Sequence, residues 1–136
     1  MTRKDLQKLS AIRLREARLL LAANAPDGAY YLAGYAVECA LKACVAKSTE
    51  RHDFPDRLRA NRSHTHSPKE LINVAELKAA HDDAMRQYEF SRRWEILTQW
   101  SEESRYKGNS FHDAEALIEA IENRKHGILP WLKRYW

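Results

Sequence analysis

The chain has 136 residues and a mass of 15.9 kDa, enough for one domain with its own core. Its 44% hydrophobic and 31% charged residues are typical of a folded, water-soluble protein and exclude an intrinsically disordered one. No run approaches the roughly 18 consecutive apolar residues of a membrane span, and the N-terminal MTRKDLQKLS lacks the apolar core of a secretion signal. We therefore expect a single cytoplasmic domain over residues 1–136 with no membrane partner.

Glycine and proline are scarce, with four of each in the chain. An all-β fold needs turn residues about every 8–12 positions, and the absence of GxGxxG and GxxxxGK[ST] excludes dinucleotide-binding and P-loop chemistry. The two cysteines, Cys39 and Cys44, lie in an apolar helical stretch, where a spacing of five points them about 140° apart and prevents a disulfide. The composition predicts an all-α protein with two buried thiols.

Apolar residues recur at helical spacing in two long N-terminal segments. We expect a first helix over residues 3–24, capped by Thr2, and a second over 29–47 that follows Pro26 and has Asp27 as its N-cap. The second segment is apolar around most of its circumference, which is typical of a helix at the centre of a bundle.

Two charged residues interrupt this apolar helix. Glu38 and Lys42 stand four positions apart with the acid first, the order that favours an ion pair along a helix. We expect Glu38 and Lys42 to form a structural pair inside the bundle; a role in ligand binding is the alternative. The small side chains around them, Gly34 among them, permit close approach of a neighbouring helix.

The connection over residues 48–66 shows no helical period and concentrates arginine and histidine. So long a connection is uncommon in a compact domain and is often functional. With a second basic cluster over residues 3–18, it contributes to a net charge of +4. Such clusters suit an anionic partner such as RNA or a nucleotide, and a solvated surface without a partner is the alternative.

Three more helices are expected in the C-terminal half. The segment 67–70 is a capping box with Pro68 at the first helical position, and it predicts a short helix that ends near Ala80. A longer helix is expected from about 81 to 104, with Arg92 and Arg93 facing solvent.

The last predicted helix begins after Asn109 or Ser110, reaches about His126 and ends with Gly127 as its C′ residue. The tail over residues 128–136 is too apolar to remain in water, so we expect it to dock on the bundle or on a partner. Together these elements predict an up-and-down bundle of about five helices with one long connection.

Three strings of the sequence resemble HEPN domains. Tyr30–Ala43 is similar to the second helix of that family, with its Glu-x-x-Leu-Lys core. His66, followed five positions later by Leu71, is similar to a helix start of the family, and Ser104–Tyr106 is similar to its Arg-Tyr turn. The resemblance covers about residues 10–125 and implies a HEPN-like helical bundle that commonly dimerises.

The resemblance also implies a class of function. HEPN proteins are often encoded beside a minimal nucleotidyltransferase or act in toxin–antitoxin and other defence systems. Many are metal-independent endoribonucleases that carry an arginine and, a few residues later, a histidine. Here four residues separate Arg59 from His64, six separate Arg59 from His66, and six also separate Arg105 from His112. The chain departs from the family pattern at Ala60, where a polar residue often follows the arginine.

The chemistry needs an acid or base that titrates near neutral pH, which imidazole supplies, and a cation for the phosphate, which arginine supplies. No cofactor and no metal are expected, because His64 and His66 have no third ligand at zinc-site spacing. A solvated or capping role is the alternative for each histidine. The candidate catalytic residues are Arg59, His64 and His66, and the candidate RNA- or nucleotide-binding residues are Arg57, Arg62 and Arg105.

Two functions therefore stay open. One is an RNA- or nucleotide-directed HEPN protein, either an endoribonuclease or a toxin–antitoxin component. The other is a non-catalytic helical dimer that serves as an interaction module for a partner such as a nucleotidyltransferase. A homodimer is expected in both, because two-fold dimers are the commonest assembly and the large side chains exceed what so small a core should bury. Those side chains are Tyr35, Tyr88, Trp94, Trp100, Trp131, Tyr135 and Trp136.

Overall fold

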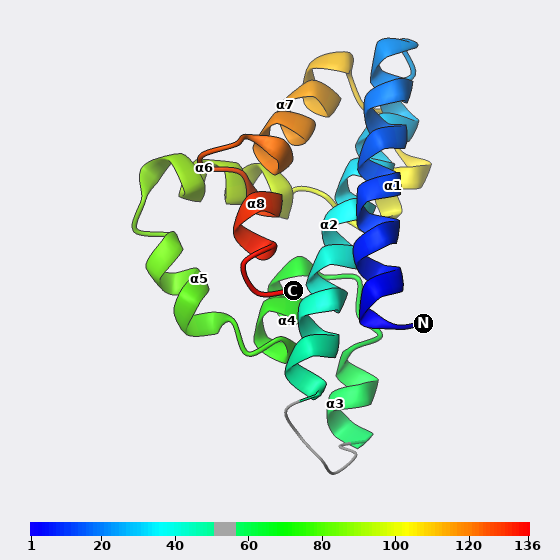
Figure 1. Cartoon of the computed structure of the whole chain (residues 1–136). Helices are drawn as coiled ribbons and strands as arrows, with labels where there is room; N and C mark the ends of the chain where they lie inside the picture. The colour runs from blue at the N-terminus through cyan, green and yellow to red at the C-terminus, as the bar shows by residue number, and fades with distance from the viewer. Residues whose placement is uncertain (51–56) are drawn as a thin grey trace.

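The computed structural model describes residues 1–50 and 57–136, with the side chain of Arg57 also outside the description. Every regular element in these residues is a helix (Figure 1). The elements are α1 (Arg3–Ala22), α2 (Pro26–Thr49), α3 (Arg57–Arg62), α4 (Pro68–Val74), α5 (Lys78–Ala84), α6 (Tyr88–Thr98), the 3-10 helix η1 (Glu102–Tyr106), α7 (Phe111–Glu122) and α8 (Ile128–Leu132). The predicted all-α class is confirmed.

Helices α1 and α2 form a long antiparallel pair (Figure 1). Thr2 caps α1 as predicted, and its side chain and that of Asp5 form a reciprocal capping box. Helix α2 begins at Pro26 with Ala25 in the N-cap position, so the prediction of Asp27 as the cap is wrong. Proline fits the first turn because its missing N–H has no intrahelical acceptor there.

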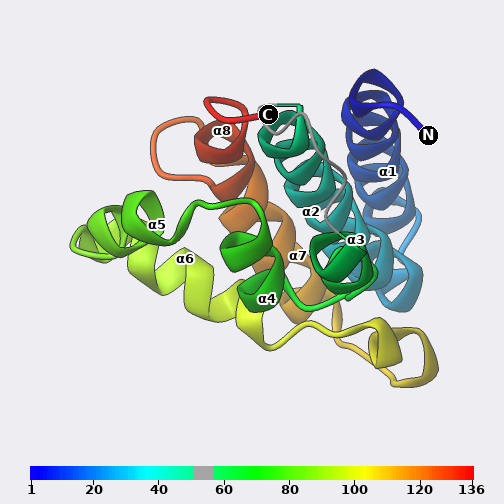
Figure 2. The same cartoon turned by 90° about the horizontal axis from the view of Figure 1, so that it is seen from below.

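Helix α2 is the centre of the bundle. It packs against α1, α4, α7, α8 and η1, and Figure 2 shows it between α1 and α7. Its side chains Val37 and Leu41 are fully buried. Both free thiols are buried with them, and burial raises the pKa of Cys39 to about 11 and that of Cys44 to about 12. Both thiols are therefore protonated and unreactive at neutral pH.

The C-terminal half is more divided than the sequence predicts. Helix α4 ends at Val74, because Glu76 takes a left-handed backbone conformation with φ of 60° and turns the chain. The single helix predicted from about 81 to 104 is three elements, namely the end of α5, α6 and η1. The residues between α5 and α6 contain neither glycine nor proline, so nothing local signals that break.

Arg93 is 4% exposed, and the prediction that it faces solvent is wrong. Its guanidinium is buried because carboxylates from α6 and α7 pair with it on both sides. Arg92, its neighbour in the chain, remains half-buried at the surface.

Helix α7 starts at the predicted cap, Ser110, but it ends at Glu122 rather than near His126. The side chain of Asn123 accepts the backbone N–H groups of Lys125 and His126 and closes the helix there. Gly127 is the N-cap of α8, so its predicted role as the C′ residue of the preceding helix is wrong.

The apolar tail docks on its own bundle. Ile128 and Leu132 of α8 are fully buried, and α8 packs on α2, α6 and α7. A single chain also buries three of the large side chains that we expected to exceed its core, since Trp94, Trp100 and Trp131 are at most 7% exposed. Within the described ranges, no helix is long and apolar enough to cross a bilayer.

Candidate functional site

A buried carboxylate lies at the middle of the candidate site. Glu38, in α2, is 2% exposed. Its Oε1 accepts a hydrogen bond from Nζ of Lys42 at 2.8 Å and lies 2.9 Å from Nδ1 of His66. On the other side of the ring, Nε2 of His66 lies 3.1 Å from Oε2 of Glu102 in η1. The imidazole of His66 therefore joins the central helix to η1.

Local structure fixes each of these side chains. Glu38 and Lys42 are one helical turn apart, so their side chains meet along α2. His66 directly precedes Ser67, whose side chain caps α4 by accepting from the backbone N–H of Glu70. The hydroxyl of Thr65 accepts from the backbone N–H of Ser67 and donates to the carboxylate of Glu70. The backbone on both sides of His66 is thus held by the start of α4.

The two ring nitrogens of His66 face different surroundings. A neutral imidazole has one N–H and can donate to only one of the two carboxylates, whereas the imidazolium donates to both. Glu38 is buried and Glu102 is half exposed. Lys42 already donates to Glu38, but an unmet hydrogen bond costs more at a buried carboxylate than at an exposed one, so we assign the N–H to Nδ1, which then donates to Glu38 and orients the ring. Nε2 is then the atom available to a ligand.

A groove of about 650 Å³ opens beside His66. Lys69 and Trp100 line it together with the carboxylates of Glu102 and Glu103. The indole of Trp100 also stacks on the ring of Tyr31, with 6.2 Å between centroids. The His66 side chain is 46% exposed, so a molecule in the groove can reach it. The volume lies within the ~300–1,000 Å³ of small-ligand sites.

Helix η1 also brings Arg105 to this region. The guanidinium carbon of Arg105 stands 4.8 Å from the ring centroid of Tyr106. The phenol of Tyr106, and after it that of Tyr31 in α2, raises the pKa of Arg105. The three strings that resemble HEPN domains therefore meet in space, because α2, His66 and η1 contact one another here.

Arg59 lies elsewhere. Its guanidinium donates to Oγ of Ser48 at 2.6 Å and to Oγ1 of Thr49 at 3.2 Å, and it pairs with the carboxylate of Glu76 at 3.5 Å. The side chain is 14% exposed. These contacts tie α3 to the end of α2 and to the turn after α4, so Arg59 holds the short helix of the basic connection in place.

His64 and Arg62 are exposed and line a second hollow of about 540 Å³, which shares only Thr65 with the groove beside His66. The side chain of Arg57 lies outside the described residues. The structure thus brings His66 to Glu38 and Lys42, and it places His64 in a different hollow.

Sequence reasoning missed Glu102, which is not among the candidate site residues predicted above. The single available signal was its position next to the Arg105–Tyr106 string. Among the residues that the structure describes, no group of three or more His, Cys, Asp and Glu side chains is placed to hold a metal ion.

We compared the chain with models of protein families, with curated proteins and with solved structures, and none of the three comparisons gave a match.

Proposed function

We propose that this chain is a HEPN-like domain that acts on RNA as a metal-independent endoribonuclease, with His66 as its acid–base residue. The observation that carries the proposal is the ring of His66, held by the buried carboxylate of Glu38 at the edge of a groove. A carboxylate that accepts from one imidazole nitrogen fixes the tautomer and directs the other nitrogen to the substrate.

The reaction that fits this arrangement is an internal transesterification. Nε2 of His66 takes the proton of a ribose 2′-hydroxyl that replaces the carboxylate of Glu102. The 2′-oxygen then attacks the adjacent phosphorus, the bond from phosphorus to the 5′-oxygen breaks, and that oxygen takes a proton from the imidazolium. The products are a 2′,3′-cyclic phosphate and a 5′-hydroxyl, and the protons balance without a metal or cofactor.

The charges around the groove define what binding requires. Glu102 and Glu103 repel a phosphate backbone, whereas Lys69 lines the same groove and Arg105 lies on the same 3-10 helix as Glu102. Arginine can hold two phosphate oxygens at once, and the exposed ring of Tyr106 offers a surface on which a base can stack. Binding through such contacts weakens with salt, with a slope of about one per phosphate contact in the logarithm.

The test incubates a labelled single-stranded RNA with the protein in EDTA and assays for cyclic phosphate ends. We expect cleavage by the parent, loss of cleavage in His66→Ala and retention in Lys78→Ala, which removes an exposed cation of α5. The His64→Ala variant distinguishes the two candidate histidines. If His64→Ala is inactive and His66→Ala still cleaves RNA, Arg59 and His64 are the catalytic pair. Intact RNA with the folded parent contradicts the proposal.

A specific observation also favours the interaction module. Phe111 of α7 is 43% exposed and lines a hollow of about 690 Å³ together with Leu21 and Ala22 of α1. We propose this face for a homodimer, or for a partner such as a nucleotidyltransferase. Light scattering at micromolar concentration should give twice the 15.9 kDa chain mass, and Phe111→Glu should return the particle to one chain. A parent of one chain mass contradicts the homodimer.

A further inference from the structure

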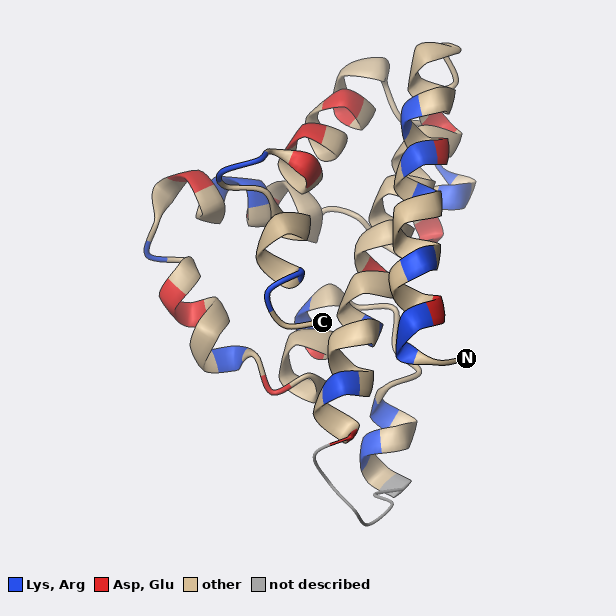
Figure 3. Ribbon diagram, viewed as in Figure 1, with Lys and Arg blue, Asp and Glu red and all other residues tan. Residues whose placement is uncertain are grey.

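A second pocket lies on another part of the molecule, between α5 and α6 on one side and the turn from α7 to α8 on the other. Its volume is about 350 Å³, and it shares no lining residue with the groove beside His66. Three cationic side chains border it, namely Arg124, Lys125 and Arg134. In Figure 3 the turn before α8 and the segment after it are both blue, so basic residues flank this short helix.

These cations have no acidic partner in the part of the chain that the structure describes. Within residues 1–50 and 57–136, no carboxylate lies within ion-pair distance of Arg124, Lys125 or Arg134. The one acid that lines the pocket, Asp83, has its own cation in Arg86 at 3.9 Å. Three unpaired cations around one small concave surface give it a positive potential, which attracts an anion.

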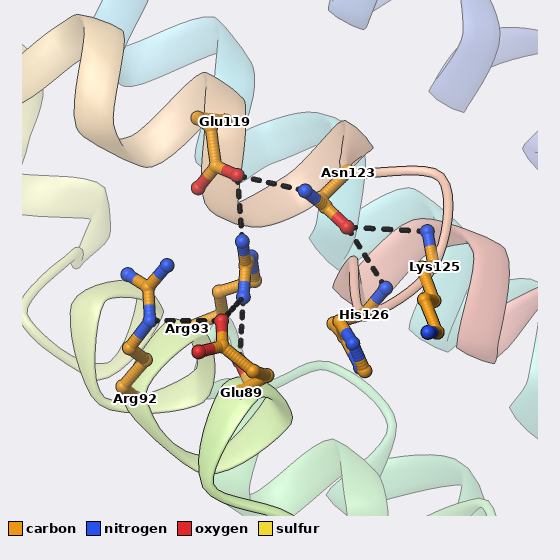
Figure 4. A network of polar contacts seen from close by, with 7 residues as sticks. All are labelled: Glu89, Arg92, Arg93, Glu119, Asn123, Lys125 and His126. Atoms are coloured by element: carbon orange, nitrogen blue, oxygen red, sulfur yellow. Dashed lines mark hydrogen bonds and ion pairs between the residues drawn. The ribbon is translucent and has the colours of Figure 1, made fainter.

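The turn that carries Arg124 and Lys125 is built by Asn123 (Figure 4). Its side-chain oxygen accepts from the backbone N–H of Lys125 at 3.1 Å and from that of His126 at 2.9 Å. Its backbone oxygen accepts from the N–H of Gly127 at 2.8 Å. Because these N–H groups are used within the turn, an anion in the pocket has to be bound by the side chains.

The buried Arg93 is linked to this turn through a shared hydrogen-bond acceptor, Glu119. The side-chain amide of Asn123 donates to Oε1 of Glu119 at 2.9 Å, and Arg93 donates to the same oxygen at 2.8 Å. Arg93 also binds Glu89 at 2.7 Å. Figure 4 shows Glu89 and Glu119 on either side of the guanidinium. Arg92 also lies 3.2 Å from Glu89, so the two arginines of α6 balance the charges of Glu89 and Glu119.

Three aromatic side chains also line the pocket. Trp131 packs against Phe90 with 5.1 Å between ring centroids and against Tyr135 with 5.3 Å, and all three rings line the pocket. The guanidinium of Arg134 lies 5.7 Å from the ring centroid of Tyr135. Phe90 and Trp131 are at most 7% exposed, so the half-buried ring of Tyr135 is the one that offers a planar ligand a stacking surface next to the cations.

We propose that this pocket binds a phosphomonoester next to a planar base, as in a nucleoside monophosphate. Arg124, Lys125 and Arg134 hold the phosphate by charge-assisted hydrogen bonds, and the ring of Tyr135 contacts the base. The volume lies at the small end of the ~300–1,000 Å³ of ligand pockets, which suits one nucleotide. The site is independent of the cleavage proposed for His66.

The experiment is calorimetric titration of the intact protein with AMP, adenosine and inorganic phosphate. AMP should bind more tightly than phosphate, and adenosine should not bind. Arg134→Glu and Lys125→Ala should each lower the affinity for AMP at least tenfold, whereas Lys133→Glu should change that affinity less than twofold. Lys133 is the matched control, because it neighbours Arg134 in the chain but does not line the pocket. His66→Ala should leave AMP binding unchanged.

The source of the nucleotide is decided by an RNA arm, with short oligonucleotides that carry a 5′-phosphate or a 5′-hydroxyl. If the protein binds only the 5′-phosphorylated oligonucleotide, and Arg134→Glu weakens this binding, the ligand is an RNA end. If the protein binds AMP but neither oligonucleotide, the ligand is a free nucleotide. Three results overturn the proposal: no AMP binding, equal affinity for AMP and phosphate, or AMP binding that Arg134→Glu leaves intact and His66→Ala removes.

Discussion

Gly34 and Trp100 are in such close contact that a Cβ built on Gly34 would stand 2.2 Å from atoms of the indole. Trp100 is 3% exposed and cannot move aside into solvent. Although alanine is favoured over glycine in a helix by about 1 kcal/mol, we expect Gly34→Ala to lower the free energy of unfolding by about 1–3 kcal/mol, the range for overpacking. Denaturant unfolding measures it.

The control for this substitution is Gly28→Ala in the first turn of the same helix. There the added Cβ would meet only the end of the flexible Leu20 side chain, at 3.0 Å. We expect a smaller change than at Gly34. If Gly34→Ala is as stable as the parent, the indole does not occupy the space against Gly34.

The carboxylate of Glu38 is expected to contribute to stability as well as to the site. Glu38→Gln keeps the shape of the side chain and removes the charge that Lys42 and His66 face. The side chains of Lys42 and His66 are 24% and 46% exposed, so water can replace part of the lost interaction with the carboxylate. We therefore expect the free energy of unfolding to fall by about 1–3 kcal/mol. Asp82→Asn, in the exposed pair with Lys78, should cost less than about 1 kcal/mol. Equal effects in thermal melting would contradict a buried role for Glu38.

Arg93 and Arg92 are adjacent but differ in burial, so they form a matched pair of substitutions. Arg93→Met leaves Glu89 and Glu119 without their shared partner, and we expect a loss of about 3 kcal/mol, the lower end for breaking a buried pair. Those two carboxylates are nearly half exposed, which limits the loss. Arg92→Met should cost less than about 1 kcal/mol. Chemical denaturation of both variants measures the difference.

The same network of Arg93, Glu89 and Glu119 predicts that the stability of the fold depends on pH in the acid range. Hydrogen bonds from Arg93 lower the pKa of Glu89 below its ordinary 4.5. Burial alone would raise the pKa of Glu119, but hydrogen bonds from Arg93 and Asn123 outweigh it and lower the value. A lowered pKa stabilises the fold above pH 4.5, and this contribution is lost as the pH falls through the folded-state pKa. Unfolding curves below pH 5 should therefore show a weaker acid dependence in Arg93→Met than in the parent.

His81 predicts a second pH dependence, at higher pH. Burial lowers the pKa of its imidazole below 6.5, partly offset by the charge of Asp82. Its ring packs against Trp94 at 4.3 Å between centroids, and its Nε2 has no hydrogen-bond partner among the described residues. The unfolded chain takes up a proton as the pH falls below 6.5 before the folded protein does, so stability should fall there.

Comparison of unfolding free energies at pH 7.5 and pH 5.5 tests this expectation. His81→Leu should reduce the loss between the two values, and His112→Gln, which changes an exposed histidine of α7, should leave it unchanged. The same loss in His81→Leu as in the parent would mean that the imidazole of His81 is protonated in the fold.

The sequence alone determined the features that depend on neighbouring residues. Caps at Thr2, Ser67 and Ser110 are set by hydrogen bonds that span three positions, so their residue types predict where α1, α4 and α7 begin. The ion pair of Glu38 and Lys42 likewise needs only one helical turn. The central place of α2 and the burial of the tail follow from their apolar content, because such surface has to leave water, but the sequence left open whether the tail docks on the bundle or on a partner.

Features that join distant segments were decided by the tertiary structure. No glycine or proline marks the break between α5 and α6, and helix α3 lies in a connection without helical period. His66 meets Glu38 across 28 positions of sequence, and only the packing of η1 on α2 brings Glu102 to the other side of the ring. Within its own helix, Arg93 is a charged residue of the kind expected at the surface. It is buried because folding places Glu119, 26 positions away, opposite its guanidinium.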